Sequence, residues 1–247
     1  MSRDGFCSLP RINRALRSGL ANCGSLADCR NVLGLELRRP YLESMRQLSF
    51  FDTSGPATQT LFEGPIGLVT YVPDFVAEDV AAAWFETLRR DVPWQSDRRL
   101  MYDREVDVPR LMASYRLDAD DLPGPIATAA DQVSAAAGIA FNAVGLNLYR
   151  DGNDSVAPHH DRLGDLAKGK PIALLSLGGP RRMTISAQDK SVKAKHVDLE
   201  SGSLLMMDYV SQMHLLHGVP KTRAPVSPRI SLAFRVRLSA TTTGEST

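Results

Sequence analysis

Apolar and polar residues alternate in several short segments of the second half of the chain. In residues 143–150, Leu146 and Leu148 fall on one face and Asn147 and Tyr149 on the other, which is the period of a half-buried strand. Turn residues separate these segments, and short strands at such spacing favour a sandwich or jelly roll. The pattern predicts strands at 143–150, 171–177, 181–186, 203–208, 213–218 and 229–237.

The first half of the chain predicts helices. From Asp74, a candidate cap, to Arg90, apolar residues including Ala83 recur at helical spacing, and an Ala-rich segment at 126–137 ends at Gly138. A short strand is expected within 64–72, and the mixed segment 100–115 predicts a solvated loop or an edge hairpin. The predicted fold is therefore α+β but mainly β, with N-terminal helices flanking a jelly-roll core.

Composition limits the class of protein. The chain has 247 residues, is 43% hydrophobic and contains no apolar run near the roughly 20 residues of a membrane span. All three cysteines lie within the first 30 positions, which favours a reducing compartment without a disulfide framework. We expect a cytoplasmic monomer that does not enter membranes.

The pattern also divides the chain. Residues 1–44 have no periodic apolar face and predict a flexible or poorly packed extension, although a transit-like leader and artefactual translation upstream of Met45 are alternatives. We expect the folded domain at 45–238 and a disordered tail at 239–247. Outside the first 44 residues the chain holds 22 basic and 24 acidic residues, so any contact with nucleic acid must come from a local patch.

A candidate metal site follows the strand at 143–150. His159 and Asp161 are two residues apart, so on an extended segment both side chains project from one face. An imidazole and a carboxylate are two of the three ligands of the 2-His-1-carboxylate triad that holds non-heme Fe(II). His160 alternates away and His196 falls in a Lys-rich loop, so spacing leaves His214 and His217 open as the third ligand.

The last predicted strand carries the second signal. Arg229, Ser231, Ala233 and Arg235 share one face of this strand. Such a face is either exposed to solvent or lines a pocket for an anion, because the arginine fork pairs bidentately with carboxylates. The dicarboxylate 2-oxoglutarate would suit such a pocket.

Together these segments resemble the AlkB family of Fe(II)/2-oxoglutarate dioxygenases. The resemblance covers roughly residues 64–238, and Val108-Pro109-Arg110 is similar to the family's nucleotide-facing segment. The other matching motifs, in family order, are Asn147-x-Tyr149, His159-x-Asp161, Ser176-Leu177-Gly178, the run from Gly202 to Met207, His217 before Gly-Val-Pro, and Arg229-x-Ser231-x-Ala233-Phe-Arg235.

The resemblance implies a double-stranded β-helix with a metal site and a cosubstrate site. Iron would be held by His159, Asp161 and His217, so the resemblance chooses His217 over His214. With O2, 2-oxoglutarate would be decarboxylated to succinate while an N-methyl group is hydroxylated and lost as formaldehyde. The distal carboxylate of 2-oxoglutarate would bind Arg229 with Tyr149 and Ser231, and its chelating end would lie near Arg235 and Asn147.

The implied substrate is an N-alkylated base in DNA or RNA. Because aromatic residues for stacking are sparse and the body is slightly acidic, we expect single strands to be handled at least as well as duplex. Met101 and Tyr102 are candidates for a finger that replaces a flipped base, and Arg110 and Tyr115 for strand and base contacts. Where the family pattern has Asn and Thr in the last strand, this chain has Ser231 and Ala233, and Leu163 follows the metal motif where an acid is common. Alternatives are the same chemistry on a protein or small molecule, and a catalytically idle binding module.

Overall fold

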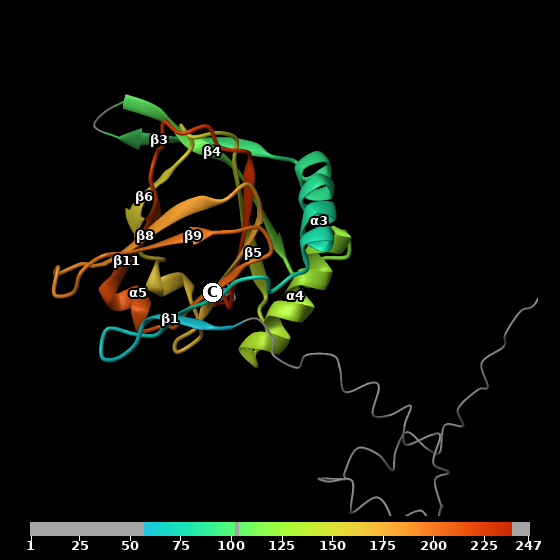
Figure 1. Cartoon of the computed structure of the whole chain (residues 1–247). Coiled ribbons are helices and arrows are strands. Elements are labelled where there is room, and N and C mark those ends of the chain that lie inside the picture. The colour runs from blue at the N-terminus through green and yellow to red at the C-terminus, as the bar shows by residue number, and fades with distance from the viewer. Residues whose placement is uncertain (1–56, 102–103, 239–247) are drawn as a thin grey trace, which may run out of the picture. The chain divides into compact units, whose positions relative to one another are not determined.

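The computed structural model describes residues 57–101 and 104–238, without the side chains of 97–107. The extension predicted at 1–44, the expected start of the domain at Met45 and the tail at 239–247 lie outside the described residues, so the domain boundaries stay predictions. Figure 1 shows two β-sheets and a pair of helices beside them.

Two antiparallel sheets form the body of the protein. The larger sheet has the order β1-β2-β10-β7-β12-β5-β4-β3, and the smaller has the order β6-β11-β8-β9. This arrangement is the predicted jelly-roll core. The larger sheet comprises β1 (Gln59–Phe62), β2 (Val69–Val72), β3 (Gln95–Met101), β4 (Arg104–Arg116), β5 (Ala143–Tyr149), β7 (Ile172–Gly178), β10 (Leu204–Met207) and β12 (Arg229–Arg235). The smaller comprises β6 (Val156–His159), β8 (Arg181–Ala187), β9 (Lys195–Leu199) and β11 (Leu215–Val219).

Two helices, α3 (Glu78–Asp91) and α4 (Gly124–Ala137), lie side by side along the larger sheet (Figure 1). Their apolar faces pack on alternate residues of β5, β7 and β12 to form the first hydrophobic core. Gly178, with φ 83°, allows close packing here, because a Cβ atom would lie 2.6 Å from the Phe85 ring. None of the described helices is long and apolar enough to cross a membrane.

A second hydrophobic core lies between the two sheets. It is formed by the opposite faces of the larger-sheet strands and by apolar residues of β8, β9 and β11. The strands of the larger sheet are therefore buried on both faces, as the continuous burial of β7 and β12 shows. The candidate site lies between the sheets, on the face of β12 that carries its arginines.

Several expected elements are confirmed with shifted bounds, and four details are wrong. Asp74 does not cap the helix, because it lies in a preceding turn with φ 50° and α3 begins at Glu78 after Ala77. Ala83 is exposed, since the buried stripe of α3 is Ala81, Phe85 and Leu88. The segment 213–218, expected as one strand, is divided between the short helix α5 (Ser211–His214) and β11. The expected loop around His196 is strand β9.

The segment 100–115 forms the edge hairpin that was one of its two predicted states. Strand β3 is the outer strand, while β4 pairs with both β3 and β5. Because strand residues point alternately to the two faces, β4 sends Arg110, Met112 and Ser114 toward the space between the sheets. This alternation decides which residues of β4 reach the candidate site.

Candidate functional site

Three side chains converge on one point in the lining of the cavity between the two sheets. His159 is the last residue of β6 and pairs directly with His217 of the neighbouring strand β11, while Asp161 follows two residues after His159. One ligand atom from each of these residues lies within 4.8 Å of the others. The pairing of β6 with β11 thus brings together residues that are 58 positions apart, and the resulting donor set suits a divalent transition metal.

Both histidines present a ring nitrogen to this point. Nδ1 of His159 lies 2.9 Å from the carbonyl oxygen of Ala157, which can only accept, so Nδ1 carries the proton and Nε2 is free to bind a metal. The two rings lie 4.5 Å apart between centroids and are tilted by 48°. Burial, followed by the neighbouring His159, lowers the pKa of His217 to about 3, so its imidazole is neutral at physiological pH.

Asp161 contacts neighbours from two other elements, one through its carboxylate and one through its backbone. Burial alone would raise its pKa, but an ion pair with the Arg235 guanidinium outweighs burial, so the pKa of Asp161 lies below its usual value. Its backbone N–H donates to Oε1 of Gln212, at 3.1 Å. Gln212 lies in α5 and is 1% exposed, and the sequence pattern gave no signal for this contact because it joins segments 51 residues apart.

The remaining histidines lie apart from this cluster. His160 lines the cavity, but its Nδ1 contacts the backbone oxygen of Asp161 at 3.0 Å. His214 is exposed at the end of α5, and His196 is exposed on β9, where its ring contacts the Thr184 hydroxyl. Of the two candidates for third ligand left open by spacing, the structure brings His217 and not His214 to His159 and Asp161.

A cavity of about 1140 Å³ extends from this cluster into the space between the sheets. Ligand pockets commonly measure roughly 300–1,000 Å³, so the volume has room for a cosubstrate and part of a second molecule. Its lining includes the three convergent side chains and the arginine face of β12. The pocket interpretation of that face is therefore favoured over exposure to solvent.

Arg229 lies at the buried end of this lining. It is 1% exposed and donates from Nη2 to the Ser176 hydroxyl at 2.9 Å, while its guanidinium carbon lies 5.3 Å from the centre of the Tyr149 ring. Its Nε and Nη1 groups are buried and have no hydrogen-bond partner among the described residues. Although burial lowers the pKa of Arg229, arginine stays protonated in proteins, so this buried cation has two N–H donors to offer an anion.

The other predicted cosubstrate residues surround Arg229 and the metal-ligand cluster. Tyr149 pairs with Arg229 across β5 and β12, and Ser231 pairs with Asn147 in the same ladder. Arg235 and Asn147, expected to act together, have different partners: Arg235 binds Asp161, and Asn147 accepts a hydrogen bond from Nε of Arg110 at 2.7 Å. The roles of these residues toward 2-oxoglutarate stay predictions.

The predicted substrate residues fall in different places. Arg110 lines the cavity and also donates to the Ser155 carbonyl at 3.2 Å. Tyr115 pairs with Val144 and packs against the helix-side core, with its pKa raised by burial, so it touches only the margin of the cavity. Met112, which sequence analysis missed, faces the cavity instead, and the alternation of β4 could have identified it. Tyr102 and the side chain of Met101 lie outside the described residues.

Comparison with known proteins gives a family match over most of the described chain. A family model of the 2OG-Fe(II) oxygenase superfamily matches residues 68–235. The chain is 35% identical over 118 residues to the DNA oxidative demethylase ALKBH2 of Bos taurus, covering 45% of this chain and 42% of that protein. It is 32% identical over 191 residues to the alpha-ketoglutarate-dependent dioxygenase alkB homolog 3 of Bos taurus, covering 69% of this chain and 66% of that protein. The chain thus spans less than half the length of the first relative.

Solved structures agree on the fold. OsALKBH1 superimposes with a TM-score of 0.51 at 16% identity, covering 70% of this chain and 99% of that structure. A prolyl-4-hydroxylase of Pseudomonas putida superimposes with a TM-score of 0.50 at 13% identity, covering 70% and 93%. At these identities the likeness shows the jelly-roll fold alone.

Proposed function

Since this chain belongs to the AlkB family of the 2OG-Fe(II) oxygenase superfamily and is therefore a dioxygenase that uses Fe(II), 2-oxoglutarate and O2, we propose that it removes alkyl groups oxidatively from nucleic acid bases. One relative is named a DNA oxidative demethylase, and the other is named an alpha-ketoglutarate-dependent dioxygenase. The observation that carries the proposal is the convergence of three donor atoms on a cavity that is also lined by a buried arginine, whose Nε and Nη1 groups have no hydrogen-bond partner among the described residues.

The metal would be held by His159, Asp161 and His217. Two imidazoles and one carboxylate form a donor set suited to a divalent ion, and three protein ligands leave coordination positions open. When bound, Fe(II) supplies the activation of O2 that couples decarboxylation of 2-oxoglutarate to hydroxylation of the substrate. The contribution of the protein is to hold these ligands in place, through Arg235 and Gln212 in the case of Asp161.

The cosubstrate would lie between this cluster and Arg229. A carboxylate beside Arg229 in the cavity would accept hydrogen bonds from its Nε and Nη1 groups, two buried donors without another partner among the described residues. The Ser176 hydroxyl fixes the guanidinium from the other side. Binding would thereby satisfy a buried charge, which is a strong reason for an anion to occupy this position rather than water alone.

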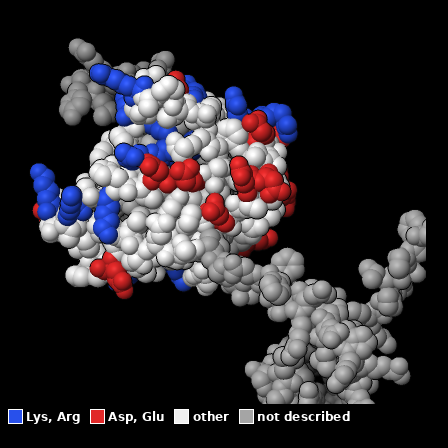
Figure 2. Space-filling model, viewed as in Figure 1, with Lys and Arg blue, Asp and Glu red and all other residues white. Residues whose placement is uncertain are grey.

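The substrate would enter at the side of the cavity lined by Arg110, Met112, His160 and Arg162. Met112 offers an apolar surface for a base, and the arginines offer charge to phosphate. On the face seen in Figure 2, basic side chains lie mainly at the edges and acidic ones gather near the middle and the helix side. No uniform basic field covers this face, which supports a preference for single strands that need no base flipping.

Formaldehyde release from a panel of N-methylated oligonucleotides, single-stranded and duplex, tests the proposal, with Fe(II) or 2-oxoglutarate withheld in control reactions. We expect release that needs both additions and is at least as fast on single strands. A methylated peptide and free methylated nucleosides belong in the same panel. Release from these but not from oligonucleotides would contradict a nucleic acid substrate while leaving the dioxygenase chemistry intact.

A further inference from the structure

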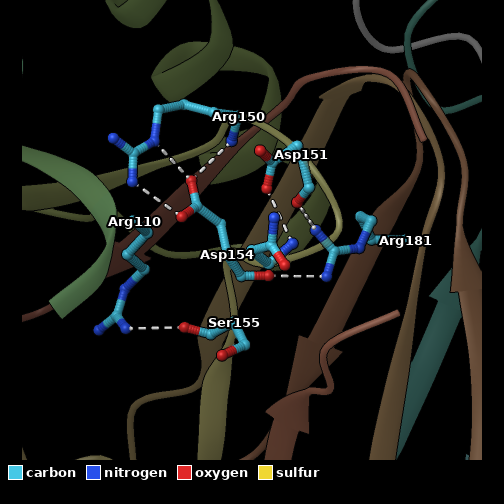
Figure 3. A network of polar contacts seen from close by, with 7 residues as sticks. Arg110, Arg150, Asp151, Asp154, Ser155 and Arg181 are labelled. Carbon is cyan, nitrogen blue, oxygen red and sulfur yellow. Dashed lines mark hydrogen bonds and ion pairs between the residues drawn. The ribbon is translucent and has the colours of Figure 1, made fainter. Parts of the chain in front are cut away.

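Arg181, the first residue of β8, is a buried arginine that touches none of the candidate metal ligands. It is 3% exposed and donates three hydrogen bonds to backbone carbonyl groups. Nη1 binds the oxygen of Asp151 at 2.9 Å, and Nη2 binds those of Asp154 at 2.8 Å and Pro220 at 2.9 Å. Figure 3 shows its guanidinium directed into the turn formed by residues 150–155, hereafter the 150–155 turn.

These carbonyls belong to the two segments that adjoin the histidine-bearing strands. The 150–155 turn leads directly into β6, which ends at His159, and Pro220 follows the end of β11, which carries His217. The two segments also meet directly, since the backbone N–H of Thr222 donates to the oxygen of Gly152 at 2.9 Å. Arg181 therefore joins the start of one ligand strand to the end of the other.

Strand β6 needs such an anchor because its own ladder is weak. It has four residues, lies at the edge of the smaller sheet and, among the strands that the structure describes, pairs only with β11. That pairing has a register shift between His217 and Val219. A short edge strand with an irregular ladder does not by itself define its position along its neighbour, so the position of His159 depends on what holds the turn before it.

The turn is reinforced from its other sides. Asp154 is 3% exposed and accepts hydrogen bonds from the backbone N–H, Nε and Nη2 of Arg150, at 2.8 to 2.9 Å. The backbone N–H of Ser155 donates to the Pro109 carbonyl at 2.8 Å, which ties the turn to β4 (Figure 3 shows the neighbouring Arg110 contact). The polar groups of the turn are thus matched to fixed partners, and Arg181 supplies the contacts on the side of β8 and β11.

Arg181 also lies beside the predicted cosubstrate pocket. Its guanidinium carbon is 5.5 Å from the centre of the Tyr149 ring, and that of Arg229 is 5.3 Å from the same centre. One residue therefore contacts both the turn before the metal-binding strand and the aromatic ring next to the candidate carboxylate-binding arginine. A lysine could not reproduce this arrangement, because a single ammonium group lacks the planar fork that reaches three carbonyls at once.

We propose that Arg181 is a positioning residue that sets the separation of His159 and His217 by anchoring the 150–155 turn to the segment after β11. The proposal rests on the proposed function in one respect, namely that these histidines bind a metal. Outer residues that orient metal ligands typically change metal affinity by 10-fold to 100-fold when altered.

The test compares Arg181→Met and Arg181→Lys with the unaltered protein, with Arg182→Met as the matched control. Arg182 is the next residue of the same strand, but it is exposed and pairs with Asp198 at the surface. Mn(II) titration without cosubstrate gives the metal affinity, and the absorption spectrum of bound Co(II) reports ligand geometry. We expect Arg181→Met to bind Mn(II) about 10-fold to 100-fold more weakly with an altered Co(II) spectrum, Arg181→Lys to fall between, and Arg182→Met to be unchanged.

A further variant covers the case in which Arg181→Met does not fold. Asp154→Asn loosens the same turn without removing Arg181, and we expect it to weaken Mn(II) binding in the same direction. If the arginine variants fold, native Mn(II) affinity and a native Co(II) spectrum in Arg181→Met and Arg181→Lys would overturn this proposal alone. If they do not fold, the same two results in Asp154→Asn would overturn it. Absence of Mn(II) binding in the unaltered protein would overturn the proposed function as well.

Discussion

Replacing Arg229 with methionine should separate cosubstrate binding from folding, because the two effects have opposite signs. Methionine keeps the length and apolar stem of the side chain, while it removes a buried charge whose Nε and Nη1 groups have no hydrogen-bond partner among the described residues. An unsatisfied buried donor costs about 1–3 kcal/mol. The ligand-free variant should therefore be as stable as the unaltered protein, or more stable.

Binding of 2-oxoglutarate should fall sharply in the same variant. Removing one partner of a buried charge pair costs about 2–5 kcal/mol, equivalent to a loss of affinity of about 30-fold to about 4,000-fold. Isothermal titration with Mn(II) present measures this affinity, and thermal unfolding with and without 2-oxoglutarate measures both effects together. The shift in melting temperature caused by 2-oxoglutarate should disappear in Arg229→Met.

Arg116→Met is the control, since Arg116 is exposed and pairs only with Asp118 at the surface. It should keep native affinity and native stability within about 0.5 kcal/mol. If Arg229→Met bound 2-oxoglutarate with native affinity, the buried arginine would not be the carboxylate partner. If the ligand-free variant lost several kcal/mol of stability, the guanidinium would have a structural role that its unpaired groups do not indicate.

Three other outcomes follow from particular contacts. Met112→Ala should lower turnover of methylated oligonucleotides by about tenfold while leaving substrate-free decarboxylation of 2-oxoglutarate intact, because Met112 lines the cavity. Tyr115→Ala should mainly lower stability, by about 2 kcal/mol, because its ring packs on the helix-side core. Parallel assays and melting curves distinguish the two variants, and the reverse pattern would refute the assignment of these residues to the two faces of β4. Burial would raise the pKa of Asp154, but its contacts with Arg150 outweigh burial and lower it. The stabilising contribution of Asp154 is therefore present above about pH 4 and is lost as pH falls through the lowered pKa. The stability difference between Asp154→Asn and the unaltered protein should be widest near pH 7 and narrow below about pH 4, and a difference that stays constant with pH would refute the ion pair. Deleting residues 1–44 should change the free energy of unfolding by less than about 0.5 kcal/mol in a denaturant titration, since that segment has no periodic apolar face; a large loss would show that it packs on the domain.

The elements predicted best from sequence are those in which one strong period continues over several residues. The alternation in 143–150 and 229–237 gave β5 and β12 nearly to the residue, and Gly138 correctly ended α4. Strand β9 was missed because it has only Val197 and Leu199 buried among polar residues, and an edge strand of this kind has the composition of a loop. Local pattern alone could not distinguish the two.

The candidate site shows a similar division. The spacing of His159 and Asp161 sufficed to predict two members of the convergent cluster, but the choice between His214 and His217 depends on the helical turn of α5, which leaves His214 exposed. Gln212 and Arg181 were not predicted, because their contacts connect segments far apart in the chain. Such contacts arise from packing and leave no local signal in one sequence.

The most direct test of the account is a Mn(II) titration of His217→Ala beside His214→Ala. The two residues lie three positions apart and were equal candidates by spacing, but only His217 has a ligand atom within 4.8 Å of those of His159 and Asp161. We expect His214→Ala to bind one Mn(II) ion with native affinity and to support formaldehyde release, and His217→Ala to lose both. Stoichiometric binding with native affinity in His217→Ala would contradict the assignment of the metal centre on which the proposed function depends.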